Sequence, residues 1–232
     1  MLSLVHEKNV QLLLQRAAWR MCARIRELLA SQERVQLAVP GGRSVVKVFE
    51  TMREEQLDWS RVHIFMLDER LVPLEHPDSN WRLLSDHFVK PMVDSGRFPA
   101  ENAHPFIYVP NTVDRGARAY ELLLKGLGFR FDVILLSAGE DGHVGALFPD
   151  HHSVADPHHG FIVMDDSPKP PPQRMTSSLS LLMTAQAAIL LFVGAGKRAA
   201  YRNFTDTSIA VSGCPAKLVL TMKDAAVFTD LD

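Results

Sequence analysis

The stretch Phe131-Asp-Val-Ile-Leu-Leu136 is a nearly continuous apolar run, and a glycine-bearing loop, residues 137–150, follows it directly. A strand with one face in water alternates apolar and polar residues, whereas a strand of a parallel sheet covered on both faces by helices is apolar almost throughout. The run is therefore predicted to form a central strand of a parallel sheet.

Segments with strand and helix patterns alternate on both sides of this run. Residues 10–28 carry apolar side chains at helical spacing, and the short run 35–39 ends at a glycine turn before the next helical segment. The pattern continues with strands expected at 62–66, 187–193, 218–221 and 226–228, and with helices expected at 79–91, 113–127 and 199–204. This alternation predicts an α/β fold with a doubly wound, mostly parallel sheet and helices on both faces.

Length and charge restrict the class of protein. The chain has 232 residues, of which 47% are hydrophobic and 22% charged, as in an ordinary globular protein. We expect a single domain over residues 1–232, because α/β folds often reach this length as one unit. The net charge is −2 and no cluster of Lys and Arg forms a basic arm, so nucleic acid is excluded as an expected partner.

The cysteines and the N-terminal segment suggest a location. Cys22 and Cys214 lie far apart without a CxxC motif, which favours a reducing compartment and no structural disulfide. Polar residues interrupt the N-terminal segment at 6–8, and the chain has no run of about 18 apolar residues. We therefore expect a cytoplasmic protein without a signal peptide or a membrane partner. The sequence leaves the oligomeric state open.

The first candidate site is the turn Pro40-Gly-Gly-Arg-Ser44, which follows a predicted strand. Its backbone N–H groups and the start of the next helix, with Ser44 as the expected cap, are suited to hold a phosphate monoester. The alternative is an ordinary turn in which glycine only supplies unusual dihedral angles. Neither this turn nor the Gly196-Lys197 pair has the spacing of a nucleotide-binding loop.

Two further candidates follow other predicted strands. Asp68-Glu-Arg70 combines a possible catalytic carboxylate with a phosphate-binding arginine, and its alternative is a solvated loop with a local ion pair. Asp141-Gly-His143 places an imidazole two residues from a carboxylate. A histidine, whose ordinary pKa is near 6.5, can take a proton from water and return it to a leaving group. The alternative here is a loop histidine that makes structural hydrogen bonds.

A group of histidines raises the question of zinc. Neighbouring histidines are expected to point in different directions, the chain has no HExxH motif, and zinc needs ligands that converge in space. We therefore expect a polar surface loop and no metal site at these residues, which are His151, His152, His158 and His159 with Asp150 and Asp156.

Taken in order, the motifs resemble those of the 6-phosphogluconolactonase family, and the resemblance spans nearly the whole chain. They are Gly41–Ser44, Leu67–Arg70 with Val72-Pro73, Ser79-Asn80, Gly139–His143 with Leu147–Pro149, Pro172–Thr176, and Gly194–Lys197. The resemblance implies a sugar-phosphate isomerase-like fold and hydrolysis of 6-phosphogluconolactone to 6-phosphogluconate in the oxidative pentose phosphate pathway. The implied partner is thus a small phosphorylated sugar lactone.

The resemblance also implies roles for individual residues. It places His143, Asp141 and Asp68 in catalysis, with His143 as the base. The substrate and its phosphate are expected to contact Gly41, Gly42, Arg43, Ser44, Arg70, Asn80, Arg174 and Lys197. No cofactor is expected, because the carbonyl of a lactone is already electrophilic and a water with a base suffices to open it.

Two alternatives remain open. The related glucosamine-6-phosphate deaminases share the Asp-Glu and Asp-Gly-His motifs but typically continue into Asn-Glu-Pro, where the glutamate assists proton transfer. Here Phe148 precedes Pro149, which favours the lactonase. The second alternative is a sugar-phosphate sensor that binds without turnover, against which the presence of both Asp141 and His143 argues.

Overall fold

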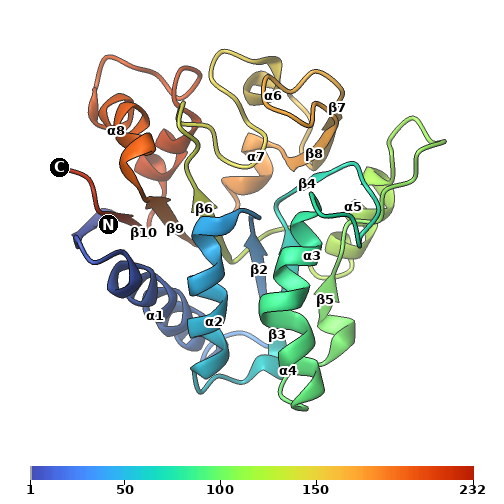
Figure 1. The fold of residues 1–232 in the computed structure, drawn as a ribbon. Helices are drawn as coiled ribbons and strands as arrows, with labels where there is room; N and C mark the ends of the chain where they lie inside the picture. Colours follow the sequence, from blue (N-terminus) through green and yellow to red (C-terminus); the bar gives the residue numbers. More distant parts are fainter. Residues whose placement is uncertain (1) are drawn as a thin grey trace.

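A seven-stranded parallel sheet forms the middle of the computed structural model, which describes residues 2–232 (Figure 1). The strands lie in the order β1-β10-β9-β6-β2-β3-β5, and every neighbouring pair is parallel. Their bounds are β1 (Leu2–His6), β2 (Val35–Val39), β3 (Val62–Met66), β5 (Ala103–His104), β6 (Val133–Ser137), β9 (Ala187–Phe192) and β10 (Ala225–Thr229). The predicted central strand is confirmed as β6, the middle strand of the order.

Helices cover both faces of this sheet, so the predicted doubly wound α/β fold is confirmed. One hydrophobic core contains apolar side chains of α1 (Val10–Leu29), α2 (Val46–Glu54), α3 (Asn80–Leu84) and α4 (Lys90–Asp94). The opposite core contains side chains of α5 (Ala117–Lys125), α7 (Leu179–Leu182) and α8 (Arg198–Thr205). A further short helix, α6, spans His152–Ala155.

The two cores explain the unbroken apolar run of β6. Val133 and Leu135 belong to the core with α1 and α2, whereas Ile134 and Leu136 belong to the core with α5 and α8. Successive side chains of a strand point to opposite faces, so a strand between two cores needs an apolar residue at every position.

A second, antiparallel sheet was not predicted. It has the order β4-β8-β7, with β4 at Asp68–Arg70, β8 at Arg174–Ser177 and β7 at Phe161–Met164. Its register pairs Asp68 with Thr176 and Arg70 with Arg174. Two motifs that lie about a hundred residues apart are therefore adjacent in space. The charged triplet of β4 has no strand pattern, so the pairing was not visible in the sequence.

Several boundaries differ from the predictions. Residues 218–221, predicted as a strand, belong to a 3₁₀-helix at Pro215–Thr221, which Pro215 initiates and whose apolar side chains join the core. The helix predicted from 113 starts only at Ala117, because Gly116 has a φ of 101° and cannot continue a helix. The helix predicted to end near Pro91 continues to Asp94 through a π-helical turn at Ser85–Val89.

Three properties of the whole chain complete the description. None of the helices within residues 2–232 has the length and apolar character needed to cross a membrane. Cys22 and Cys214 are both buried free thiols. The expectation of a single domain over 1–232 stays a prediction.

Candidate active site

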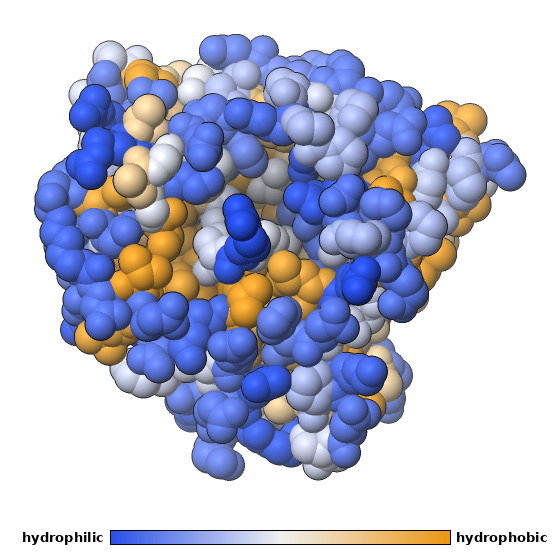
Figure 2. All heavy atoms as spheres, viewed as in Figure 1, coloured by the Kyte–Doolittle hydropathy of each residue, from blue (hydrophilic) through white to orange (hydrophobic). Residues whose placement is uncertain are grey.

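A cleft of about 380 Å³ lies at the carboxyl ends of four neighbouring strands, β9, β6, β2 and β3. In Figure 2, which keeps the view of Figure 1, the face is hollowed near its centre. Ten of the eleven predicted site residues line the cleft, and they are Gly41, Gly42, Arg43, Ser44, Asp68, Arg70, Asn80, His143, Arg174 and Lys197. Asp141 does not line it but contacts His143. Six further residues line the cleft, and no individual role was predicted for them: Pro40, Gly139 and Glu140, which belong to the predicted motifs, and Ser137, Ala138 and Gly145.

The position of the cleft follows from the topology. The chain runs outward from β2 to β3 and β5, and it later returns to the other side of β2 with β6 and β9. The loops after β2 and β6 therefore diverge, which opens a crevice between them. Ser44, which follows β2, and Ser137, at the end of β6, are hydrogen-bonded to each other, with their Oγ atoms 2.9 Å apart. The expectation that Ser44 caps a helix is wrong, because it lies inside a 3₁₀ turn and makes no capping bond.

His143 and Asp141 form a closely bonded pair. Nδ1 of His143 lies 2.6 Å from Oδ1 of Asp141, and the backbone N–H of His143 donates to the same oxygen at 3.1 Å. The carboxylate only accepts, so Nδ1 carries the proton and Nε2 keeps its lone pair when the ring is neutral. Burial acts to raise the pKa of Asp141, but the hydrogen bond and charge of His143 outweigh it and hold this pKa well below its usual range.

The loop that holds the pair is tightly folded. Gly139 donates its N–H to the carbonyl of His143 at 2.8 Å, and a Cβ at Gly139 would lie 2.0 Å from Cε1 and Nδ1 of the imidazole. Only glycine therefore lets the ring occupy this place. On another side, the buried ring of Phe148 lies 4.7 Å from the imidazole, centroid to centroid. The glycine at 139 was visible in the sequence, but its close approach to the ring was not.

Asp68 is a buried carboxyl at the side of the cleft and is 5% exposed. Asn80 donates to its Oδ2 and to its backbone carbonyl, both at 3.0 Å. Its Oδ1 makes no hydrogen bond within residues 2–232. Burial raises the pKa of Asp68 despite the positive charges of Arg70 and Arg174. One oxygen is thus held by Asn80, while the other keeps its full capacity for a hydrogen bond.

Glu69, the middle residue of the same triplet, has a structural role. Its carboxylate accepts from the backbone N–H groups of Arg70, Asn80 and Trp81, each at 2.7 Å, and from Ser79 Oγ at 3.1 Å. Burial raises the pKa of Glu69 to about 7 against these hydrogen bonds. The carboxylate fixes the start of α3 and so positions Asn80 beside Asp68.

The four cationic side chains of the cleft differ in how they are bound. Arg174 donates to the carbonyls of Lys169, Pro170 and Pro171 at 3.0–3.4 Å, and Arg70 donates to a loop carbonyl, that of Asp78, at 2.5 Å. The side chains of Arg43 and Lys197 make no hydrogen bond or ion pair within the described part of the chain. All donors of these two side chains are therefore free for an anionic ligand, and Arg70 keeps free donors as well, since its Nε makes no hydrogen bond within residues 2–232.

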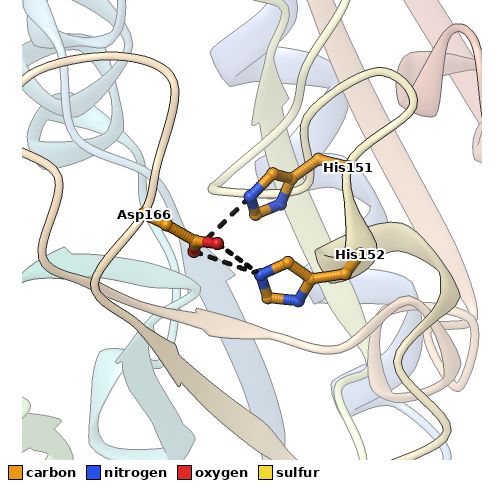
Figure 3. A group of neighbouring side chains, drawn as sticks. All are labelled: His151, His152 and Asp166. Atoms are coloured by element: carbon orange, nitrogen blue, oxygen red, sulfur yellow. Dashed lines mark hydrogen bonds and ion pairs between the residues drawn. The ribbon is translucent and has the colours of Figure 1, made fainter.

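The predicted arrangement of the histidine group is wrong for two of its members. His151 and His152 do not point in different directions, because their ring centroids lie 4.1 Å apart and both rings face the carboxylate of Asp166 (Figure 3). His151 has the extended backbone of a helix cap and His152 is the first residue of α6. This change of backbone conformation brings neighbouring side chains to the same side. The group does not line the cleft.

Comparisons with known proteins give a consistent result. A family model described as glucosamine-6-phosphate isomerases/6-phosphogluconolactonase matches residues 8–228. A 6-phosphogluconolactonase of Borreliella burgdorferi is 31% identical over 195 residues, which are 84% of this chain and 83% of that protein. A probable 6-phosphogluconolactonase 2 of Oryza sativa subsp. indica is 33% identical over 204 residues, 79% of this chain and 71% of its own length.

Solved structures share the fold. A 6-phosphogluconolactonase of Shewanella baltica superposes with a TM-score of 0.84 at 24% identity, covering 99% of this chain and 97% of that one. A monomeric glucosamine-6-phosphate deaminase superposes with a TM-score of 0.77 at 20% identity, covering 98% and 96%. The fold is therefore common to proteins named for both reactions, and only the site distinguishes the two.

Proposed function

The chain belongs to the family of glucosamine-6-phosphate isomerases and 6-phosphogluconolactonases, and on that premise we propose that it hydrolyses 6-phosphogluconolactone to 6-phosphogluconate. The observation that carries this proposal is the His143–Asp141 pair, whose imidazole lines a cleft that also holds four cationic side chains. A base for water and a binding place for a phosphorylated anion are the two requirements of the reaction.

The phosphate is assigned to the cationic side of the cleft. Arg43 and Lys197 have free donors, and the backbone N–H groups of Gly41 and Gly42 donate no hydrogen bond within residues 2–232. Arg70 adds a charge from β4. We assign to Arg174 mainly the support of the loop at 169–171, since its guanidinium bonds the carbonyls there.

His143 is assigned as the base. It takes a proton from water on Nε2 while the water oxygen bonds to the lactone carbonyl carbon, giving a tetrahedral oxyanion. Collapse of this intermediate breaks the bond between that carbon and the ring oxygen, and the ring oxygen receives the proton from Nε2. Asp141 holds the tautomer and favours the imidazolium that forms between the two steps.

We assign Asp68 to the stabilisation of the oxyanion by hydrogen bonding. Its raised pKa keeps more of the carboxyl protonated than usual, and a protonated carboxyl can donate a hydrogen bond to the developing charge. Oδ1 is the atom without a partner, while Asn80 fixes Oδ2. Backbone N–H groups near His143 are the other candidates for this role.

The neighbourhood of His143 favours the lactonase over the deaminase. The resemblance places the deaminase's assisting glutamate at the residue before Pro149, and here that residue is Phe148, which is buried against the imidazole. The position thus offers an apolar ring and no second proton carrier. Opening a lactone needs one base and one water, which the cleft supplies.

One assay tests the proposal against its alternatives. 6-Phosphogluconolactone is generated enzymatically, and its loss is followed with and without the protein, since the lactone also hydrolyses spontaneously. Ammonia release from glucosamine 6-phosphate is measured in parallel. We expect faster lactone loss and no ammonia. Ammonia release would identify a deaminase, and saturable binding without turnover of either substrate would identify a sensor.

We also propose the partner of the protein and the place of the reaction in the cell. The partner is the small phosphorylated lactone, and neither nucleic acid nor a membrane is part of the proposal. We propose the cytoplasm as the place of the reaction, on the pattern of two unpaired, buried cysteines.

A further inference from the structure

His151, His152 and Asp166 bring three metal-ligand atoms together outside the cleft (Figure 3). Nε2 of His152 lies 3.1 Å from both carboxylate oxygens of Asp166, and Nε2 of His151 lies 3.5 Å from Oδ1. The ligand atoms all lie within 4.8 Å of one another. The two histidines open α6, whereas Asp166 comes from the loop between β7 and β8.

One ligand atom of the group has an ionic contact but no hydrogen bond. Nε2 of His151 is buried but makes no hydrogen bond within residues 2–232. Buried polar atoms are nearly always paired, and a water or an ion is one of the partners that completes an atom without a protein hydrogen bond. His152 and Asp166 lie open to solvent, with side chains 57% and 64% exposed, so an ion can reach the group.

The two nitrogen-to-oxygen distances suit a tetrahedral ion. Bonds of 2.0–2.1 Å from Zn²⁺ to imidazole nitrogen and carboxylate oxygen set neighbouring ligand atoms about 3.3 Å apart. The two nitrogen-to-oxygen distances, 3.1 and 3.5 Å, lie on either side of this value. Two imidazoles and one carboxylate select a transition ion, since Mg²⁺ and Ca²⁺ prefer sites made of oxygen alone.

We propose that His151, His152 and Asp166 bind one divalent transition-metal ion, with Zn²⁺ as the best match, and that this ion joins the start of α6 to the loop between β7 and β8. The proposal concerns a site apart from the catalytic cleft and does not depend on the lactonase assignment.

Metal binding requires His151 to change its tautomer, because Nδ1 accepts a hydrogen bond from the backbone N–H of Ser153 in the structure. A metal on Nε2 requires the proton on Nδ1, and Nδ1 lies 3.0 Å from Oγ of the buried Ser153. This hydroxyl already accepts from the backbone N–H of Phe148 and has a second lone pair for the imidazole. Metal binding therefore replaces the hydrogen bond that Nδ1 accepts from the Ser153 N–H, at 3.2 Å, with one that Nδ1 donates to the Ser153 hydroxyl.

The loop that the ion would fasten leads back to the cleft. Three residues after Asp166, Nζ of Lys169 lies 3.7 Å from Oδ2 of Asp141. Arg174 already fixes this part of the loop through the carbonyls of 169–171. The ion therefore adds a second attachment to a segment that is held without it. We expect it to stabilise the fold rather than to take part in the reaction.

Cobalt provides the direct test, because Co²⁺ in a four- or five-coordinate site with nitrogen ligands has visible absorption bands. The metal-stripped protein is titrated with Co²⁺ at neutral pH, and Zn²⁺ is then added as a competitor. We expect one Co²⁺ per chain, bands that Zn²⁺ abolishes, and a rise in Tm with either ion. Asp166→Asn and His152→Gln should each raise the Kd at least about tenfold.

His159→Gln is the matched control, because His159 is an exposed histidine of the same segment outside the group. It should bind Co²⁺ like the parent. The metal-free Tm of each variant verifies folding, and the exposed His152 makes its replacement the safer of the two. The proposal is overturned if the parent gives no bands, if both variants bind as tightly as the parent, or if His159→Gln weakens binding equally.

Discussion

Two groups in this protein each place imidazole beside aspartate, and they differ in which ring nitrogen faces the carboxylate. In the cleft, Nδ1 of His143 contacts Asp141, which leaves the lone pair of Nε2 for a proton. At the start of α6, Nε2 of both His151 and His152 faces Asp166. The first arrangement prepares one nitrogen for acid–base chemistry, whereas the second brings three ligand atoms to one point.

The surroundings extend the contrast. The His143–Asp141 pair is partly covered, with side chains 22% and 31% exposed, and Lys169 and Lys197 lie close enough to act on its charge. Asp166 is 64% exposed, and its ionic partners within residues 2–232 are the two histidines. The cations around the His143–Asp141 pair favour binding of an anion. Few cations lie near Asp166, so its negative charge is available to a metal ion.

The largest expected effect comes from removing the proposed base. His143→Asn keeps much of the shape of the ring but cannot carry a proton, so kcat should fall by about 10² to 10⁴ with little change in KM. A general base gives kcat/KM a limb that rises with pH as the base loses its proton, and this limb should be absent in the variant. His152→Gln, in the other group, should leave kcat unchanged. A kcat for His143→Asn within about threefold of the parent would exclude His143 as the base and point to Asp68.

Sequence reasoning found the parts of the cleft that follow strands, because parallel strands bring their carboxyl ends to one edge. It did not find the β4–β8 pairing, since Asp68–Arg70 has no strand pattern and its partner lies far along the chain. It also missed the convergence on Asp166. This convergence depends on the change of backbone conformation between His151 and His152 and on Asp166, which lies in a loop fourteen residues after His152. Neither feature leaves a periodic signal in the sequence.

The second-largest effect tests whether the position of the His143 imidazole matters as much as its ability to carry a proton. Gly139→Ala should lower kcat by about 10², because the new Cβ would lie 2.0 Å from the imidazole and must displace it. Gly126→Ala is the matched control, since a Cβ there meets its nearest neighbour at 3.4 Å. Circular dichroism shows whether both variants fold. Normal kcat in a folded Gly139→Ala protein would mean that the ring position is not critical.

The third effect concerns the charge around the cleft. Arg70→Ala removes a charge-assisted hydrogen bond to phosphate, so KM for the phosphorylated lactone should rise about 10- to 100-fold. The rate with unphosphorylated gluconolactone should change little, and measuring both substrates separates phosphate binding from general damage. Equal losses on the two lactones would show that Arg70 is not a phosphate ligand.

A third imidazole group, without any carboxylate, should respond to acid. His104 Nε2 lies 3.1 Å from Nδ1 of His63, and burial together with the nearby His63 lowers the pKa of His104 to about 4. The unfolded chain therefore binds this proton near pH 6.5 and the folded protein only near 4, so stability is lost as pH falls through that window.

Replacing His104 by Phe should remove about 1–2 kcal/mol of the pH dependence, after allowance for solvent screening of the partly exposed ring. Urea unfolding at pH 7.5 and 5 measures it, and an unchanged difference would contradict the assignment.

Of all these changes, metal removal should have the smallest effect on catalysis. It should alter stability through the group that contains Asp166 and leave the reaction at the His143–Asp141 pair unchanged. Zinc at a hundredfold excess over its Kd should stabilise the fold by about 2.7 kcal/mol, which raises Tm by several degrees, and a chelator should reverse this. The kcat for the lactone should stay the same in both states, since water and His143 perform the reaction without the ion. Loss of activity on chelation, with recovery by zinc in the parent but not in Asp166→Asn, would instead make the second group part of catalysis. A shift of Tm with no change in kcat leaves each group with its own role.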